Sequence, residues 1–152
     1  MHTVFDRLTG PLRYGWAAPC TLLGLVLAVP WLAAGARARR INGVLEVAFT
    51  GYPMQQRWVH KLPFSAMTLG HVVLGVSHGE LARLRTHEHA HVRQYERWGV
   101  FFFPAYGLSS LHQFLCGRGL YWHNRFEVQA RAQAARKERA DSSPRPGRSG
   151  PA

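Results

Sequence analysis

The longest hydrophobic feature of the chain is an uncharged run from Trp16 to Ala36. A helix of this length covers roughly 31 Å, which matches the hydrocarbon core of a bilayer. Pro19 and Pro30 would weaken a helix in a soluble protein, whereas membrane helices tolerate proline better. The run therefore predicts a single transmembrane helix over residues 16–36, a signal anchor preceded by an N-terminal segment of residues 1–15.

A cleaved signal peptide is the alternative interpretation of this run. Arg7 and Arg13 would then form its basic region, and Ala34-Gly35-Ala36 would supply small residues at a cleavage site. The run is longer than the usual apolar region of about 7–15 residues, which favours an uncleaved anchor. More arginines follow the run closely than precede it, so the positive-inside rule favours a cytoplasmic C-terminal body.

Shorter apolar patterns predict two strands in this body. Residues 43–49 end at the turn signal Gly51-Tyr52-Pro53. Residues 68–76 are rich in β-branched and apolar side chains, and their glycines would leave room for a neighbouring backbone. We expect one strand over each of the two ranges.

A helix is predicted directly after the second strand. Ser77 and Glu80 form a capping-box signature at its start, the helix continues to Trp98, and Gly99 ends it. Apolar residues and the polar candidates for chemistry lie together on one broad face of this helix. We expect this face to contact the rest of the protein.

Two further helices and a tail complete the chain. Residues 105–115 form an apolar helix with Pro104 in its first turn, and this helix belongs either to the core or to the membrane surface. Asn124 caps a helix through Arg139, and residues 140–152, dominated by Ser, Pro, Gly and Arg, form a disordered tail. The predicted fold class is α+β: an N-terminal transmembrane helix followed by a short β-sheet and further helices.

The composition adds a strong positive charge to this picture. The formal net charge of +11 suggests anionic partners, either phospholipid head groups or nucleic acid. No basic stripe is interleaved with stacking aromatic residues, so we expect membrane lipid and not nucleic acid. Cys20 and Cys116 lie in unrelated contexts without CxxC spacing, which indicates neither a thiolate metal site nor a disulfide framework.

The candidate chemistry lies in the helix over residues 77–98, which contains an HExxH motif. At about 100° per residue, His87 and His91 lie on nearly the same line of the helix, and Glu88 is displaced to one flank. Neutral imidazoles bind zinc, and a neighbouring carboxylate can take a proton from a zinc-bound water. We therefore predict a zinc site with His87 and His91 as ligands and Glu88 as the catalytic base; His89 faces away and is predicted to be a surface or packing residue.

A catalytic zinc site needs a third protein ligand, and Glu127 is the candidate. It lies in the first turns of the last predicted helix, and an entire helix separates it from His91, so the chain can return to the site. The alternative is structural: Glu127 would complete a capping box with Asn124 and pair with Arg131 at i+4.

Other side chains are weaker candidates. His112 and His123 are alternative candidates for the third ligand, although each of them can instead be an ordinary polar residue. Glu96 is excluded, because it points about 140–180° away from the two motif histidines. Tyr121 is a candidate for polarising a substrate carbonyl, against the alternative of a buried tyrosine with a satisfied hydroxyl.

The order of these parts resembles the small gluzincin-type metallopeptidases, the minigluzincins. The segment from His87 to Gly99, followed by Asn124-x-x-Glu127-x-x-Ala130, also resembles segments in a group of small bacterial membrane proteins. The resemblance covers roughly residues 41–135 and implies a zincin-like domain within residues 41–139. It implies zinc bound by the two motif histidines and Glu127, Glu88 as general base, and a strand around His71 that borders the cleft and pairs with an extended peptide.

Three functions follow from these patterns. The leading one is a zinc-dependent hydrolase anchored in the bacterial inner membrane, a metallopeptidase in which Glu88 activates a zinc-bound water to attack a peptide or protein substrate. The rival is a noncatalytic membrane protein stabilised by zinc, in which Glu88 only supports the ligands. The third is a basic interaction protein whose HExxH sequence is accidental.

Overall fold

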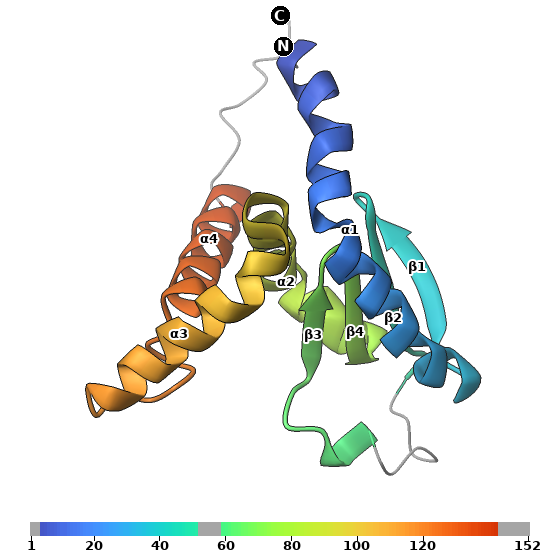
Figure 1. Cartoon of the computed structure of the whole chain (residues 1–152). Helices are drawn as coiled ribbons and strands as arrows, with labels where there is room; N and C mark the ends of the chain where they lie inside the picture. Colours follow the sequence, from blue (N-terminus) through green and yellow to red (C-terminus); the bar gives the residue numbers. More distant parts are fainter. Residues whose placement is uncertain (1–3, 52–58, 143–152) are drawn as a thin grey trace, which may run out of the picture.

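A mixed four-stranded sheet and four α-helices make up the described chain in the computed structural model, which describes residues 4–51 and 59–142 (Figure 1). The predicted α+β class is confirmed at this level. The elements, in chain order, are α1 (Val4–Ala33), β1 (Arg37–Ile41), β2 (Val44–Phe49), a short 3-10 helix η1 (Val59–Lys61), β3 (Ala66–Leu69), β4 (Val72–Ser77), α2 (His78–Trp98), a second 3-10 helix η2 (Gly99–Phe101), α3 (Phe102–Leu115) and α4 (Arg125–Ser142).

The sheet has the strand order β1-β2-β4-β3, with β2 and β4 parallel and both outer pairs antiparallel. The predicted strand over residues 43–49 matches β2. The strand β1 was not predicted, although Asn42 and Gly43, with φ of 51° and 83°, form the two-residue turn that an Asn-Gly pair favours in a hairpin.

The predicted single strand over residues 68–76 is wrong. The chain forms a hairpin there, in which β3 and β4 are joined by a turn at Gly70 and His71. Gly70 adopts a φ of +58°, which favours glycine, and a Cβ atom at Gly70 would overlap Oγ1 of Thr21 in α1. The glycine therefore permits both the turn and the close approach of α1.

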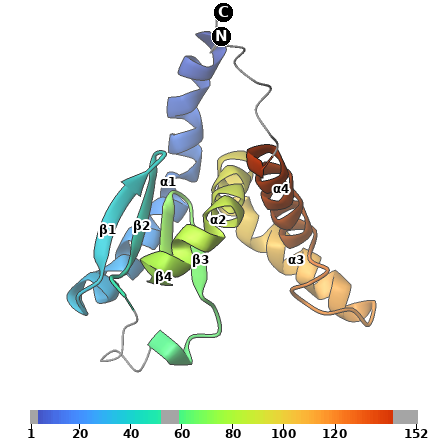
Figure 2. The same ribbon diagram turned by 180° about the vertical axis from the view of Figure 1, so that it is seen from behind.

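Helices cover both faces of the sheet. On one face Val47, Phe49, Val72 and Leu74 pack with α1, and on the other face alternate residues such as Val73 pack with α2. Figure 1 shows α1 in front of the strands, and Figure 2, seen from behind, shows α2 on the opposite side. Because successive side chains of a strand point to opposite faces, two buried faces explain why the central strands β2 and β4 are apolar almost throughout.

One narrow stripe of α1 contacts the sheet and α2. Ala17, Cys20, Gly24, Ala28 and Trp31 recur every three or four positions and are buried. Trp31 Nε1 donates to the carbonyl of Gly75 at 3.3 Å. This helix therefore forms part of the core and does not stand apart from a separate domain that begins at residue 41.

The membrane prediction concerns the same helix. Among the described residues, Arg13–Ala33 is the stretch of helix that is long and apolar enough to cross a membrane. A signal sequence or the core helix of a soluble protein would meet the same test, so this observation shows only that crossing is possible.

The remaining helices agree well with the sequence pattern. The side chain of Ser77 accepts a hydrogen bond from the backbone N–H of Glu80, and α2 ends at Gly99, as predicted. The helix α3 begins at Phe102, before the predicted residue 105, and α4 continues to Ser142. The predicted tail lies, from residue 143 on, outside the described residues.

Candidate metal centre

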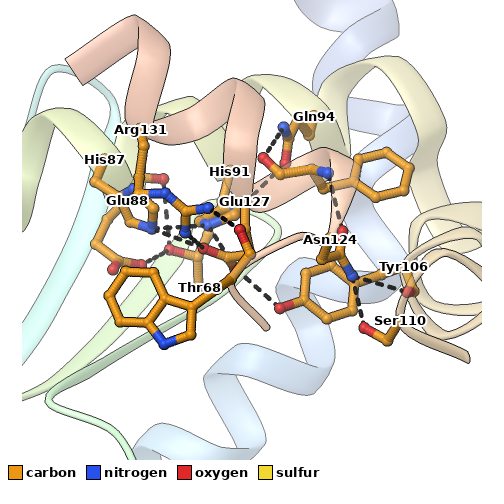
Figure 3. A network of polar contacts seen from close by, with 12 residues as sticks. Thr68, His87, Glu88, His91, Gln94, Tyr106, Ser110, Asn124, Glu127 and Arg131 are labelled. Atoms are coloured by element: carbon orange, nitrogen blue, oxygen red, sulfur yellow. Dashed lines mark hydrogen bonds and ion pairs between the residues drawn. The ribbon is translucent and has the colours of Figure 1, made fainter. Parts of the chain in front are cut away.

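His87 and His91 of α2 converge with Glu127 of α4 (Figure 3). The Nε2 atoms of the two histidines are 3.1 Å apart. Glu127 Oε2 lies 3.4 Å from Nε2 of His87, and Oε1 lies 3.3 Å from Nε2 of His91. The two motif histidines and the distant glutamate therefore present their ligand atoms to one point.

These separations suit a single tetrahedral ion. Two imidazole nitrogens and a carboxylate oxygen, each about 2.0–2.1 Å from zinc, are separated from one another by about 3.3 Å. The two histidine nitrogens are 3.1 Å apart, and each of them has a different oxygen of Glu127 at 3.3 or 3.4 Å. With one ligand atom taken from each residue, all three atoms lie within 4.8 Å of one another. The donor set of two histidines and one glutamate is also one that catalytic zinc sites use.

Gln94 orients the ring of His91. Its Nε2 donates to the carbonyl of Phe126 at 3.0 Å, so its Oε1 must be the atom that lies 2.8 Å from Nδ1 of His91. This oxygen accepts the Nδ1 proton, which leaves the lone pair of His91 Nε2 directed at the centre. A single glutamine thus sets the tautomer of a ligand and also ties α2 to the start of α4.

The start of α4 positions Glu127. Asn124 is fully buried, and its Oδ1 caps the helix by accepting from the N–H of Phe126 at 2.9 Å. Its Nδ2 donates to the carbonyl of Tyr106 and to Ser110 Oγ at 3.0 and 2.6 Å. The predicted cap is therefore confirmed, and it holds α4 against α3.

The carboxylate of Glu127 points into the centre, toward side chains from several elements. The hydroxyl of Tyr106 donates to Oε1 at 2.9 Å, and Nη1 of Arg131 lies 3.8 Å from Oε2. The guanidinium of Arg131 lies 5.2 and 5.9 Å from the ring centroids of Trp122 and Tyr121. The predicted pair with Arg131 is present, and it coexists with the approach to both histidines.

A buried carboxylate beside two histidines dominates the electrostatics of the centre. Burial raises the pKa of Glu127, but hydrogen bonds with His87 and His91 outweigh burial and hold the pKa well below its usual value. Burial lowers the pKa of His91, but the carboxylate of Glu127 outweighs it and raises the pKa. Burial and Glu127 together raise the pKa of Tyr106, and they raise the pKa of Tyr121 to about 12. At neutral pH the centre therefore contains an ionised carboxylate and protonated tyrosines.

Glu88 lies beside the three candidate ligands and is buried. Oγ1 of Thr68, in the edge strand β3, donates to Oε2 of Glu88 at 2.6 Å. This contact fixes the direction of the carboxylate. Glu88, both histidines and Glu127 all line one cavity of about 930 Å³ between β3, α2, α3 and α4, so a small molecule or a peptide segment has access to them.

Other histidines and acids flagged in the sequence lie elsewhere. His112 and His123 are exposed and lie outside the cavity lining. His89 is partly buried, with Nε2 3.7 Å from Glu46, in keeping with a packing role. Oε1 of Glu96 lies 3.2 Å from His71 Nε2, away from the centre, as its exclusion required. Tyr121 does line the cavity.

The expectation that a strand around His71 borders the cleft is wrong. His71 is buried in the β3–β4 turn, where its ring stacks on Tyr14 with centroids 3.9 Å apart. The strand that borders the cavity is β3, through residues 66–69. The glycine-rich turn moves His71 beyond the end of the strand.

The sequence analysis missed Thr68, Gln94 and Tyr106 as parts of the centre. Gln94 follows His91 by three positions on the same helical face, so its spacing was a usable signal. Thr68 and Tyr106 reach the centre only through the folding of β3 and α3 against α2. No local pattern marks either of them.

Comparison of the chain with models of protein families, with curated proteins and with solved structures finds no match. The geometry of the centre itself is therefore the guide to its function.

Proposed function

We propose that this protein is a membrane-anchored zinc-dependent hydrolase of the metallopeptidase class. The observation that carries the proposal is the arrangement of His87, His91 and Glu127 at separations suited to zinc. Glu88 lies next to them in a cavity large enough for a peptide segment. A zinc ion bound there would act as a Lewis acid, which polarises a carbonyl and lowers the pKa of a water.

Glu88 has the role of general base in this proposal. Its carboxylate accepts a proton from the water that attacks the scissile carbonyl carbon and then passes that proton to the leaving amine nitrogen as the C–N bond breaks. Thr68 holds Oε2 of Glu88, so the carboxylate is oriented before the substrate arrives. Tyr121, whose pKa is raised to about 12, remains a protonated donor that can stabilise negative charge on the carbonyl oxygen.

The position of the edge strand β3 favours a peptide as the substrate. It is last in the strand order, so β4 is its one neighbour within the sheet, and residues 66–69 line the cavity. An extended peptide that paired with this edge would lie alongside Glu88, because Thr68 contacts that carboxylate. Main-chain pairing of this kind selects peptides over other hydrolysable substrates.

The membrane part of the proposal depends on α1. This helix contains the apolar stretch Arg13–Ala33, and its buried stripe packs on the sheet. Cleavage after Ala36 would remove Ala28 and Trp31 from that core, which favours a retained helix over a signal peptide. Location at the bacterial inner membrane with a cytoplasmic body stays part of this proposal.

The Glu88→Gln variant tests the function. Zinc content should stay at that of the wild type, whereas hydrolysis of a degenerate library of internally quenched peptides should fall by at least about 100-fold. Glu80→Gln is the matched control on the same helix, because Glu80 lies in its first turn and pairs with Arg83. This control should retain both zinc and activity.

A metal measurement on Glu127→Ala completes the experiment. Loss of a ligand should lower the zinc content of purified protein, as measured by atomic emission. Equal zinc in wild type and Glu127→Ala would remove Glu127 from the site. Zinc-loaded wild type with no hydrolytic activity above Glu88→Gln would instead support the noncatalytic, zinc-stabilised alternative.

A further inference from the structure

The helix α3 has its polarity reversed relative to a helix on a water-facing surface. Its serines face the protein: Ser110 Oγ accepts from Asn124, and Ser109 Oγ accepts from the backbone N–H of Arg125. Its large apolar side chains face outward, with 67% of Leu108 and 75% of Leu115 exposed. A helix in contact with water shows the opposite pattern, so the outer face of α3 suits an apolar environment.

The outer surface of α1 has the same character. Among residues 13–33 of α1, for which burial is described, only the narrow stripe from Ala17 to Trp31 is buried, and around it Leu22, Val26 and Val29 are each exposed by 60% or more. Figure 1 shows α1 and α3 on the near side of the molecule, and Figure 2 shows α1 behind the strands and α3 behind α4. The two apolar helices thus belong to one face of the protein.

The mouth of the metal cavity adjoins this face. Phe103, Tyr121 and Trp122 line the cavity and are also exposed by 41 to 66%. Aromatic side chains with one polar end favour the boundary between hydrocarbon and water. Whatever covers the apolar face therefore lies beside the entrance to the centre.

The charges around the face fit an anionic lipid surface. Residues 100–117 contain no charged side chain, and exposed Arg97 and Arg118 flank them. Exposed Arg13 and Arg37 flank the apolar part of α1 in the same way. No acidic residue occurs between Arg97 and Phe126. Arginines at both ends of each apolar stretch would contact lipid phosphates.

Crossing of the bilayer by α1 alone conflicts with its packing. The ideal Cβ position of Gly24, in the middle of the apolar stretch, lies 2.9 Å from the carbonyl oxygen of Leu69 in β3. The strand β1, which begins just after the helix, carries exposed Arg37, Arg39 and Arg40. A crossing helix would carry a sheet with open edges and these arginines toward the hydrocarbon, where unpaired backbone groups and charges are costly.

We propose that α1 and α3 lie together in one leaflet of an anionic bilayer, so that the metal cavity opens at the membrane surface. The substrate is then a peptide segment held at that surface, such as the end of a membrane-bound protein. The membrane geometry is inferred from the apolar face alone, whereas the substrate class rests on the proposed hydrolase function.

Labelling of single cysteines tests the geometry. In a Cys20→Ser/Cys116→Ser background, Gly15→Cys and Ala38→Cys place one thiol at each end of the apolar part of α1, at exposed positions. Cells expressing the full chain are converted to spheroplasts or to inverted membrane vesicles and treated with an impermeant maleimide. Both thiols should react from the same side. Reaction from opposite sides, or recovery of the chain in the soluble fraction, would overturn the proposal.

The native thiol Cys116, exposed at the end of α3, reports the depth of that helix. An environment-sensitive fluorophore on Cys116 should be quenched by brominated lipid when the purified chain is added to vesicles of phosphatidylcholine and phosphatidylglycerol. Leu111→Glu/Leu115→Glu should abolish this quenching, whereas Gln129→Glu/Ala132→Glu, with the same added charge on exposed positions of α4, should not. An unquenched wild-type fluorophore would refute the placement of α3.

Activity separates this inference from the proposed function. Leu111→Glu/Leu115→Glu should cleave free library peptides normally but should lose about tenfold on the same peptides tethered to vesicles by an acyl chain, because it no longer shares a surface with them. Glu88→Gln should lose both activities yet keep the quenching. Equal loss on free and tethered peptides, or release of fatty acid from the vesicles in place of peptide cleavage, would exclude the membrane-held peptide as substrate.

Discussion

At the scale of single residues, the candidate ligands of the centre are held in place by side chains that are not themselves candidate ligands. Gln94 sets the tautomer of His91, and Tyr106 holds one oxygen of Glu127. Partners of this kind raise the basicity of a ligand and reduce its freedom before the ion binds. The affinity for zinc should therefore depend on them as well as on the ligands.

Replacing Gln94 by leucine tests this dependence. The variant keeps the side-chain size but removes the acceptor for the Nδ1 proton of His91 and the donor to Phe126. We expect zinc affinity to fall by about 10–100-fold, measured by competition with a chromogenic chelator. Gln133→Leu, which removes only an exposed contact with Arg93, is the control and should keep wild-type affinity. Equal affinities in the two variants would contradict the orienting role of Gln94.

At the scale of elements, α1 acts as a layer of the fold. Ala28 and Trp31 of its buried stripe form one hydrophobic cluster with β2 and β4, and Ala17 and Cys20 belong to a second cluster with Tyr95 of α2. Gly24 lies where the helix approaches the sheet closely, with the ideal Cβ position 2.8 Å from Cβ of Val72. A membrane helix that served only as a tether would place no such demand on position 24.

Gly24→Val tests the packing of α1. The added side chain would overlap the backbone and side chains of the β3–β4 hairpin, so we expect a loss of about 1–3 kcal/mol in the free energy of unfolding. Leu25→Val, at the next and exposed position, should change stability by less than about 0.5 kcal/mol. Thermal unfolding in mild detergent measures both variants, and a neutral Gly24→Val would show that α1 is not seated on the sheet.

At the scale of the whole molecule, a polar cluster joins α1, the β3–β4 turn and α2. The ring of His71 stacks on Tyr14, its Nδ1 lies 3.4 Å from Oγ1 of Thr21, and its Nε2 lies 3.2 Å from Glu96. The hydrogen bond with His71 holds the pKa of Glu96 below its usual value of 4.5, despite the opposing effect of burial. The cluster thus stabilises the fold through an ionised carboxylate.

Comparison of Glu96→Gln with the wild type should show that this contribution to stability depends on pH. Because the pKa of Glu96 is lowered by folding, its stabilisation is present above about pH 4.5 and is lost as the pH falls through the lowered value. We expect the variant to be less stable than wild type by about 1 kcal/mol at pH 7, and the difference to shrink below pH 4.5. Asp141→Asn, which removes an exposed pair with Lys137, should show little difference at either pH. A difference for Glu96→Gln that stayed constant with pH would rule out the ionised carboxylate as the source of the stabilisation.

Local patterns were sufficient to predict α2, its caps and the shared face of His87 and His91, because these depend on contacts within a few residues along one helix. They also predicted the cap at Asn124, the strand β2 and the apolar stretch of α1. Glu127 was named as a candidate on its place in the sequence, and the structure brings it to the histidines. Its role as a ligand, like that of zinc itself, stays a prediction.

Only the tertiary structure decided which sides of these elements meet. The uncharged run from Trp16 to Ala36 predicts a membrane helix but does not show that one side of it packs on β2 and β4. The same holds for Thr68 and Tyr106, which reach the centre from β3 and α3. The sequence by itself determined which chemical groups are available on one helix. Long-range packing determined which other groups surround them. Contacts between residues distant in the chain could not be predicted, because they produce no periodic pattern in the sequence.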